Sequence, residues 1–149
     1  MSHNRKGYRG YIGARMGLER SAPQHIQQLV MRDYCQRNGL AFLLSAVEYR
    51  MKFCTMILDA VLDELDHLEG IVMYSIALFP EKKEKRMAMY RRVIDQGCAL
   101  HTAVEAYVVR NWDDAKRLED IFLVQEALTA AHSTTLESLK QWDRQHAGT

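Results

Sequence analysis

The feature that most constrains the fold is an alternation of short, strand-length runs with longer segments of helical periodicity. The short runs are rich in apolar and aromatic residues; three cover residues 8–13, 40–46 and 71–75, and a fourth lies within residues 99–109. A helical segment follows each of them. Strands buried on both faces and joined through helices pack as a parallel sheet covered on both sides, with right-handed crossovers. The pattern therefore predicts a small three-layer α/β domain with about four parallel strands flanked by helices.

The helical segments carry both periodicity and end signals. The clearest one places apolar residues at offsets 0, 3, 4, 7, 8, 11 and 14 from Cys54, which is one face of a helix. Pro23 suits a first helical turn, and Gly39 follows the expected end of that helix. Pro80 and Gly97 bracket a charged helix in the same way.

Length and composition limit the classes of protein to which the chain can belong. The 149 residues fit one domain, which we place at residues 1–130, with residues 131–149 as a polar C-terminal tail or a short docking helix. With 48% hydrophobic and 26% charged residues, wholesale disorder is excluded. The formal net charge of +1 gives no global attraction to nucleic acid or to an anionic membrane.

Targeting and redox signals favour a cytoplasmic protein. No apolar run approaches the roughly 20 residues that span a bilayer, and the basic N-terminus lacks the apolar stretch of a signal peptide. Cys35, Cys54 and Cys98 are odd in number and widely spaced, which argues against a disulfide framework and against structural zinc. We interpret them as buried small hydrophobic residues rather than reactive thiols, and we expect a soluble cytoplasmic location.

Polar residues gather where the expected strands end. Ligands of open α/β sheets bind outside the carboxyl ends of the strands. On this rule the candidate catalytic residues are Glu48, Tyr49, Ser75, His101 and Glu105, and the candidate ligand-binding residues are Arg15, Gln24, His25, Ser45 and Tyr74. The sequence contains no P-loop, H-E-x-x-H or EF-hand motif, so we expect neither a metal nor a cofactor.

Several of these candidates have a structural interpretation as well as a functional one. Arg15 suits a phosphate or carboxylate but also a surface ion pair with Glu48. Glu48 suits a general base but also a solvated loop carboxylate. His101 suits a proton shuttle but also a hydrogen-bonded core residue, and it shares strand parity with Glu105. Ser75 lacks the G-x-S-x-G context of a nucleophilic serine.

The order of these segments over residues 8–109 resembles the catalytic domain of serine recombinases, the resolvases and invertases. That family opens its site with Y-A-R-x-S, in which the serine cleaves DNA. Here G-A-R-M-G keeps Arg15 but has Gly17 at the serine position. The family's D-R-L-x-R motif is matched by I-A-L-F-P, with Ala77 and Leu78 in place of its aspartate and arginine. The resemblance implies a resolvase-like or flavodoxin-like fold and argues against recombinase activity.

Longer strings resemble the sporadic carbohydrate cluster proteins of bacteria. They are G-Y-I-G-A-R, A-P-Q-H-I-Q-Q-L-V-M-R-D-Y-C, L-L-S-A-V-E-Y, V-L-D-E-L and G-I-V-M-Y-S. Members of that family are encoded in scattered surface-polysaccharide gene clusters of the O-antigen type. The resemblance therefore implies a role in making or modifying a surface carbohydrate, such as a lipopolysaccharide component. It carries no assigned reaction and no assigned catalytic residues.

Three functional hypotheses follow from these observations. The first is binding or conversion of an anionic sugar or sugar phosphate, with a cofactor-free isomerase, epimerase or lyase step if the chain is an enzyme. In that case Arg15 and the helix start near Gln24 would hold the anion. The second is a non-catalytic partner subunit of another enzyme in the pathway. The third and most remote is a degenerate resolvase-like DNA-binding protein. We also expect a homo-oligomer and no membrane association.

Overall fold

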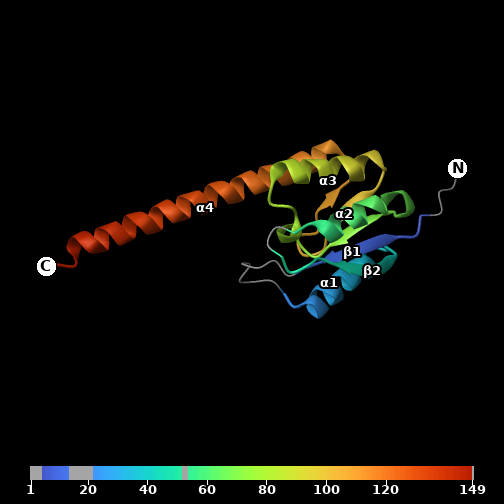
Figure 1. Ribbon diagram of the computed structural model, residues 1–149, viewed down its shortest axis with the longest axis horizontal. Helices are drawn as coiled ribbons and strands as arrows, with labels where there is room; N and C mark the ends of the chain where they lie inside the picture. Colours follow the sequence, from blue (N-terminus) through green and yellow to red (C-terminus); the bar gives the residue numbers. More distant parts are fainter. Residues whose placement is uncertain (1–4, 14–21, 52–53, 149) are drawn as a thin grey trace. The chain divides into compact units, whose positions relative to one another are not determined.

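The computed structural model describes residues 5–13, 22–51 and 54–148 (Figure 1). Its centre is a five-stranded sheet with the order β2-β1-β3-β4-β5. Four strands run parallel and the last pairs antiparallel with β4: β1 Tyr8–Ile12, β2 Phe42–Val47, β3 Gly70–Met73, β4 Ala99–Thr102 and β5 Val108–Val109.

Helices cover both faces of this sheet. In Figure 1, α1 lies on one side of the strands, and α2 and α3 lie together on the other. The helical elements of this domain are α1 Gln24–Arg37, α2 Met56–Asp63 and α3 Lys83–Asp95, with two 3-10 turns, η1 Leu65–His67 and η2 Ile76–Leu78. The predicted three-layer α/β class is confirmed.

The short fifth strand was not expected from the sequence. The sequence predicts one strand within residues 99–109, but β4 ends at Thr102 and a turn reverses the chain before β5. Ala106 adopts a left-handed conformation in this turn, with φ of 57°. Non-glycine residues rarely take positive φ, so the residue type at this position did not suggest a turn. Hydrophobic periodicity reports which residues are buried and does not indicate where the chain reverses.

The core beneath α1 follows from helical spacing. Met31, Tyr34 and Cys35 recur at the interval of one helical turn, are almost wholly buried, and pack against Ile12 and Val72 of the sheet. On the other face, α2 buries Leu58, Val61 and Leu62. These are members of the apolar stripe that predicted the helix. Because both faces are covered, β3 and β4 are buried at every residue.

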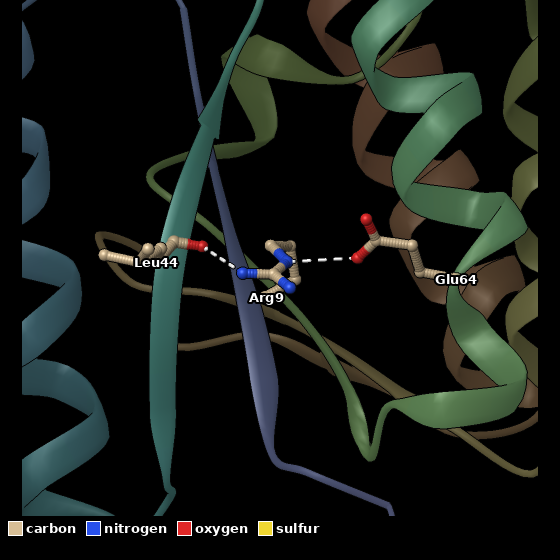
Figure 2. A network of polar contacts seen from close by, with 3 residues as sticks. All are labelled: Arg9, Leu44 and Glu64. Carbon is tan, nitrogen blue, oxygen red and sulfur yellow. Dashed lines mark hydrogen bonds and ion pairs between the residues drawn. The ribbon is translucent and has the colours of Figure 1, made fainter.

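A bulge interrupts the pairing of β1 with β2. Tyr8 pairs with Phe42 and Gly10 pairs with Ser45, so two residues of β2 stand opposite Arg9 alone. Figure 2 shows how Arg9 spans this irregularity: its Nη1 donates to the carbonyl of Leu44 at 2.9 Å, and its Nε pairs with the Glu64 carboxylate at 3.1 Å. The guanidinium therefore ties the bulged strand to the end of α2.

The chain divides into two compact units, Met1–Trp112 and Asp113–Thr149. The second unit is almost entirely the long helix α4, Trp112–His146. Its buried residues are Ala115 and Leu118, and residues 123–148 are all exposed. Residues 131–146, predicted as a tail or a short docking helix, form the last turns of this helix. Among the described residues, no helix is long and apolar enough to cross a membrane.

Candidate functional site

The topology creates a natural site at the carboxyl ends of β1 and β3. From β1 the chain passes through α1 to β2 on one side, and from β3 it passes through α3 to β4 on the other. The chain thus leaves two neighbouring strands in opposite directions and on opposite faces of the sheet. Ligands of open α/β sheets bind at such a switch point. Gly13 and Ser75 follow the two strands there.

Ser75 and Glu105 form a hydrogen-bonded pair at this switch point. The Ser75 hydroxyl donates to the Glu105 carboxylate at 2.5 Å, and the Ile76 backbone N–H donates to both carboxylate oxygens at 3.3 and 3.2 Å. The Ser75 oxygen in turn accepts from the Ala77 N–H at 3.2 Å. The pair, predicted as two separate candidates, is therefore one polar unit, and both residues are only partly buried.

The turn after β4 places Glu105 in this unit. Ala103 and Val104 donate their N–H groups to the carbonyls of Met73 and Tyr74, at 2.9 and 3.0 Å. These bonds fold the turn back against the end of β3. The expectation that Glu105 shares a strand face with His101 is therefore wrong, because the strand ends before Glu105.

A residue that sequence reasoning missed, Gln27, fixes the end of β1. Its side chain is buried and donates to the carbonyls of Gly13 at 3.0 Å and Ala22 at 2.7 Å, while its Oε1 accepts from the Gly13 N–H at 3.4 Å. It thereby links the two residues that flank positions 14–21. The available signal was its spacing, since Gln27 lies on the same helical face as Met31 and Tyr34.

Glu48 lies at the end of β2 but caps a helix. Its buried carboxylate accepts from the N–H groups of Ile57 and Leu58 at the start of α2, at 3.1 and 3.0 Å. It also accepts from the Tyr11 hydroxyl at 2.8 Å and from the Cys54 thiol at 3.3 Å. Burial by itself would raise the pKa of this carboxyl, but these hydrogen bonds together lower it. A general base needs a pKa nearer neutrality and a free lone pair, so this geometry favours the capping role.

His101 is a core residue on the α1 face of β4. Its Nδ1 lies 2.7 Å from the Tyr34 hydroxyl, and its ring contacts the rings of Tyr8 and Tyr34 edge to face. Its Nε2 is buried and has no hydrogen-bond partner within the described part of the chain. Burial, aided by the positive charge of Arg110, lowers the pKa of His101 to about 4. The imidazole is therefore neutral at pH 7.

We expect this buried histidine to make the fold sensitive to mild acid. Below its ordinary pKa of 6.5 the unfolded chain binds a proton that the folded chain does not bind until about pH 4. Stability is therefore lost as the pH falls through this window, by about 2 kcal/mol between pH 7 and pH 5. Urea denaturation at several pH values measures the loss. His101→Gln should remove most of it, whereas His132→Gln, on the exposed part of α4, should not. An equal slope in both variants would contradict the assignment.

In the described part of the chain, no hydrogen bond joins the Ser75–Glu105 pair to four further candidates. Ser45 lies within β2, where its buried Oγ stands over Gly10 and has no partner among the described residues. Gln24 and His25 form the first turn of α1, which no side chain caps in the described structure, and His25 is exposed. Tyr49 is half-exposed just after β2.

Tyr74 and Arg15 complete the predicted set. Tyr74 packs on the core beneath α1, next to Ser75 in the chain. Arg15 lies outside the described residues.

The three cysteines are buried and free, as predicted, and burial raises the pKa of Cys35 to about 11. No group of three or more histidine, cysteine, aspartate or glutamate residues in the described ranges is arranged to hold a metal ion.

Comparison with solved structures places this architecture among known folds. A resolvase family site-specific recombinase from Streptococcus pneumoniae matches with a TM-score of 0.58 and 10% sequence identity, covering 92% of this chain and 99% of that one. The fold is resolvase-like. The N-terminal catalytic domain of TP901-1 integrase matches with a TM-score of 0.55 and 8% identity, covering 83% of this chain and 98% of that one. No protein-family model and no curated protein matches the sequence.

The resolvase-like fold agrees with the order of segments predicted from the sequence. At 8–10% identity the likeness concerns the fold alone. What the chain does must therefore be argued from its own residues at the switch point.

Proposed function

We propose that this chain binds an anionic sugar derivative, such as a sugar phosphate, at the carboxyl ends of β1 and β3. The observation that carries the proposal is the switch point itself, flanked by Gly13 on one side and by the Ser75–Glu105 pair on the other. A carboxylate and a hydroxyl at a strand end suit the hydroxyl groups of a sugar, which both donate and accept hydrogen bonds.

Arg15 supplies the anion-binding group in this proposal. It follows Gly13 by two residues in the sequence. A guanidinium binds phosphate or carboxylate through paired hydrogen bonds. The resemblance to sporadic carbohydrate cluster proteins supports a sugar as the ligand and a bacterial surface polysaccharide as the product of the pathway.

Glu105 is the proton acceptor if the bound sugar is converted. It is partly buried in the turn after β4, and its hydrogen bonds with Ser75 and Ile76 hold it in place. A cofactor-free isomerase, epimerase or lyase step begins with proton abstraction by such a base. Glu48, the base first considered, is a helix cap in this proposal, and His101 is a core residue.

A second candidate function is that of a partner subunit for another enzyme of the pathway. The exposed part of α4 favours it, because this surface carries large apolar side chains: Leu123, Val124, Leu128, Leu136, Leu139 and Trp142. Co-purification with a pathway enzyme, without ligand binding by the isolated chain, would favour this function. A DNA-binding role is the remote third candidate, since Gly17 stands where recombinases have their serine.

Thermal unfolding in the presence of ligands tests the first proposal. A ligand at 100 times its dissociation constant adds about 2.7 kcal/mol, which raises the melting temperature by roughly 5–10 °C for a chain of this size. We expect such a rise with one class of sugar phosphate or nucleotide sugar, and none with duplex DNA. Arg15→Ala and Ser75→Ala should each weaken the ligand affinity at least tenfold. The rise in melting temperature at the same ligand concentration should therefore be smaller.

Matched controls separate a site from a general effect. Arg91→Ala on α3 and Ser138→Ala on α4 change exposed residues of the same types and should leave the rise intact. The proposal is wrong if no sugar derivative stabilises the chain, or if Arg15→Ala and Ser75→Ala respond as the controls do. A rise with duplex DNA alone would instead support the third candidate.

A further inference from the structure

The outer edge of β2 differs from the rest of the sheet in its exposure. β2 stands at one end of the strand order, so its outer side faces no other strand of the described structure. Every residue of β2 is partly or largely exposed, with Leu44 at 77% and Val47 at 39%, whereas β3 and β4 are buried throughout. The exposed apolar surface continues beyond the strand at Tyr49 and Met51.

Apart from the bulge opposite Arg9, this edge lacks the features that keep exposed strands from pairing. Edge strands are usually very short, carry lysine, proline or inward-pointing charges, or twist away at a bulge. Residues 40–47 read L-A-F-L-L-S-A-V, with no charge and no proline, and β2 is six residues long. The opposite edge follows the usual rule, because β5 has only two residues.

The backbone and the charges together indicate what covers the edge. Another strand can satisfy the whole row of backbone N–H and C=O groups at such an edge through main-chain hydrogen bonds. An uncharged strand can face its own copy without like-charge repulsion, and the net charge of +1 opposes association only weakly.

We propose that two copies of this chain pair their β2 strands antiparallel about a two-fold axis near Leu44. The two sheets then continue as one, and Leu44 of each copy lies beside Leu44 of the other. A two-fold axis makes the same patch serve both partners and closes the assembly at a dimer. This interface is independent of the proposed ligand site, which lies at the carboxyl ends of β1 and β3.

Light scattering during size-exclusion chromatography tests the interface. The full chain should have twice its monomer mass of 17.3 kDa at tens of micromolar concentration. Leu44→Lys should give the monomer mass, because it brings two like charges together across the axis. Leu128→Lys on α4 is the matched control, since Leu128 is 64% exposed, and it should remain a dimer. Circular dichroism should show both variants folded, since both side chains point to solvent.

Charge complementation provides the second arm of this experiment. Leu44→Glu should also be monomeric, whereas an equal mixture of Leu44→Lys and Leu44→Glu should regain the dimer through opposite charges. A monomeric parent chain would overturn the proposal. So would a Leu44→Lys variant that stays dimeric, a mixture that stays monomeric, or a dimer lost in Leu128→Lys, which would place the interface on α4.

Discussion

Glu48→Gln should lower the free energy of unfolding by about 2–4 kcal/mol, measured by urea denaturation at pH 7. The carboxylate accepts hydrogen bonds from two N–H groups of α2, from the Tyr11 hydroxyl and from the Cys54 thiol. Glutamine replaces one acceptor oxygen with an N–H₂ group, so at least one buried donor faces another donor. The negative charge that complements the start of α2 is lost as well.

A matched variant and the pH dependence make this expectation specific. Glu137→Gln changes an exposed glutamate on α4 and should alter stability by less than about 0.5 kcal/mol. Because the pKa of Glu48 is lowered on folding, its contribution is present above the ordinary carboxyl pKa and is lost as the pH falls through the folded value. The difference between the parent chain and Glu48→Gln should therefore shrink in acid, at lower pH than the loss assigned to His101. Unchanged stability at pH 7 would show that the cap contributes nothing.

Arg86→Ala should destabilise the fold by about 3–5 kcal/mol. Arg86 is only 4% exposed, and its Nη1 donates to the carbonyls of Pro80 at 3.2 Å and Glu81 at 2.6 Å. These carbonyls belong to the segment that joins η2 to α3. Removal of the guanidinium leaves them without this donor and opens space in the interior, and each effect costs stability.

A lysine variant distinguishes charge from geometry at this position. Arg86→Lys keeps the positive charge but reaches one carbonyl at a time, so we expect a loss smaller than that of Arg86→Ala but still above about 1 kcal/mol. Arg91→Ala, on the exposed face of the same helix, should stay close to the parent. If all three variants denature at the same urea concentration as the parent chain, the buried guanidinium does not contribute to stability.

The same buried groups show where sequence reasoning stopped. Helix α2 and its apolar face were predictable, because Leu58, Val61 and Leu62 recur at helical spacing. That Glu48 would cap this helix was not predictable, since the carboxylate and the N–H groups of Ile57 and Leu58 meet only when the end of β2 packs against α2. Spacing along the chain describes one element at a time.

The candidate site divides in the same way. The general rule for open sheets was enough to name both Ser75 and Glu105 from the sequence. Their contact required a turn after β4 that contains the positive φ of Ala106, and no local pattern indicated it. Gln27 escaped notice for the opposite reason, since its helical spacing was visible but its partners, Gly13 and Ala22, are brought to it only by folding.

The sequence by itself determined the α/β class, the helices that cover the sheet and its parallel strands, because burial on one face or on both leaves a periodic trace in the order of residues. It did not indicate that α4 continues to His146. Only the tertiary structure decided which polar groups meet. In the folded chain, Ser75 bonds to Glu105, and Glu48 caps α2 instead of lying free as a base. His101 is buried in the core, and β2 is an edge strand of the sheet. The physical reason is that hydrogen bonds act over about 3 Å between residues distant in sequence. Their partners are therefore fixed by packing and strand order rather than by local periodicity.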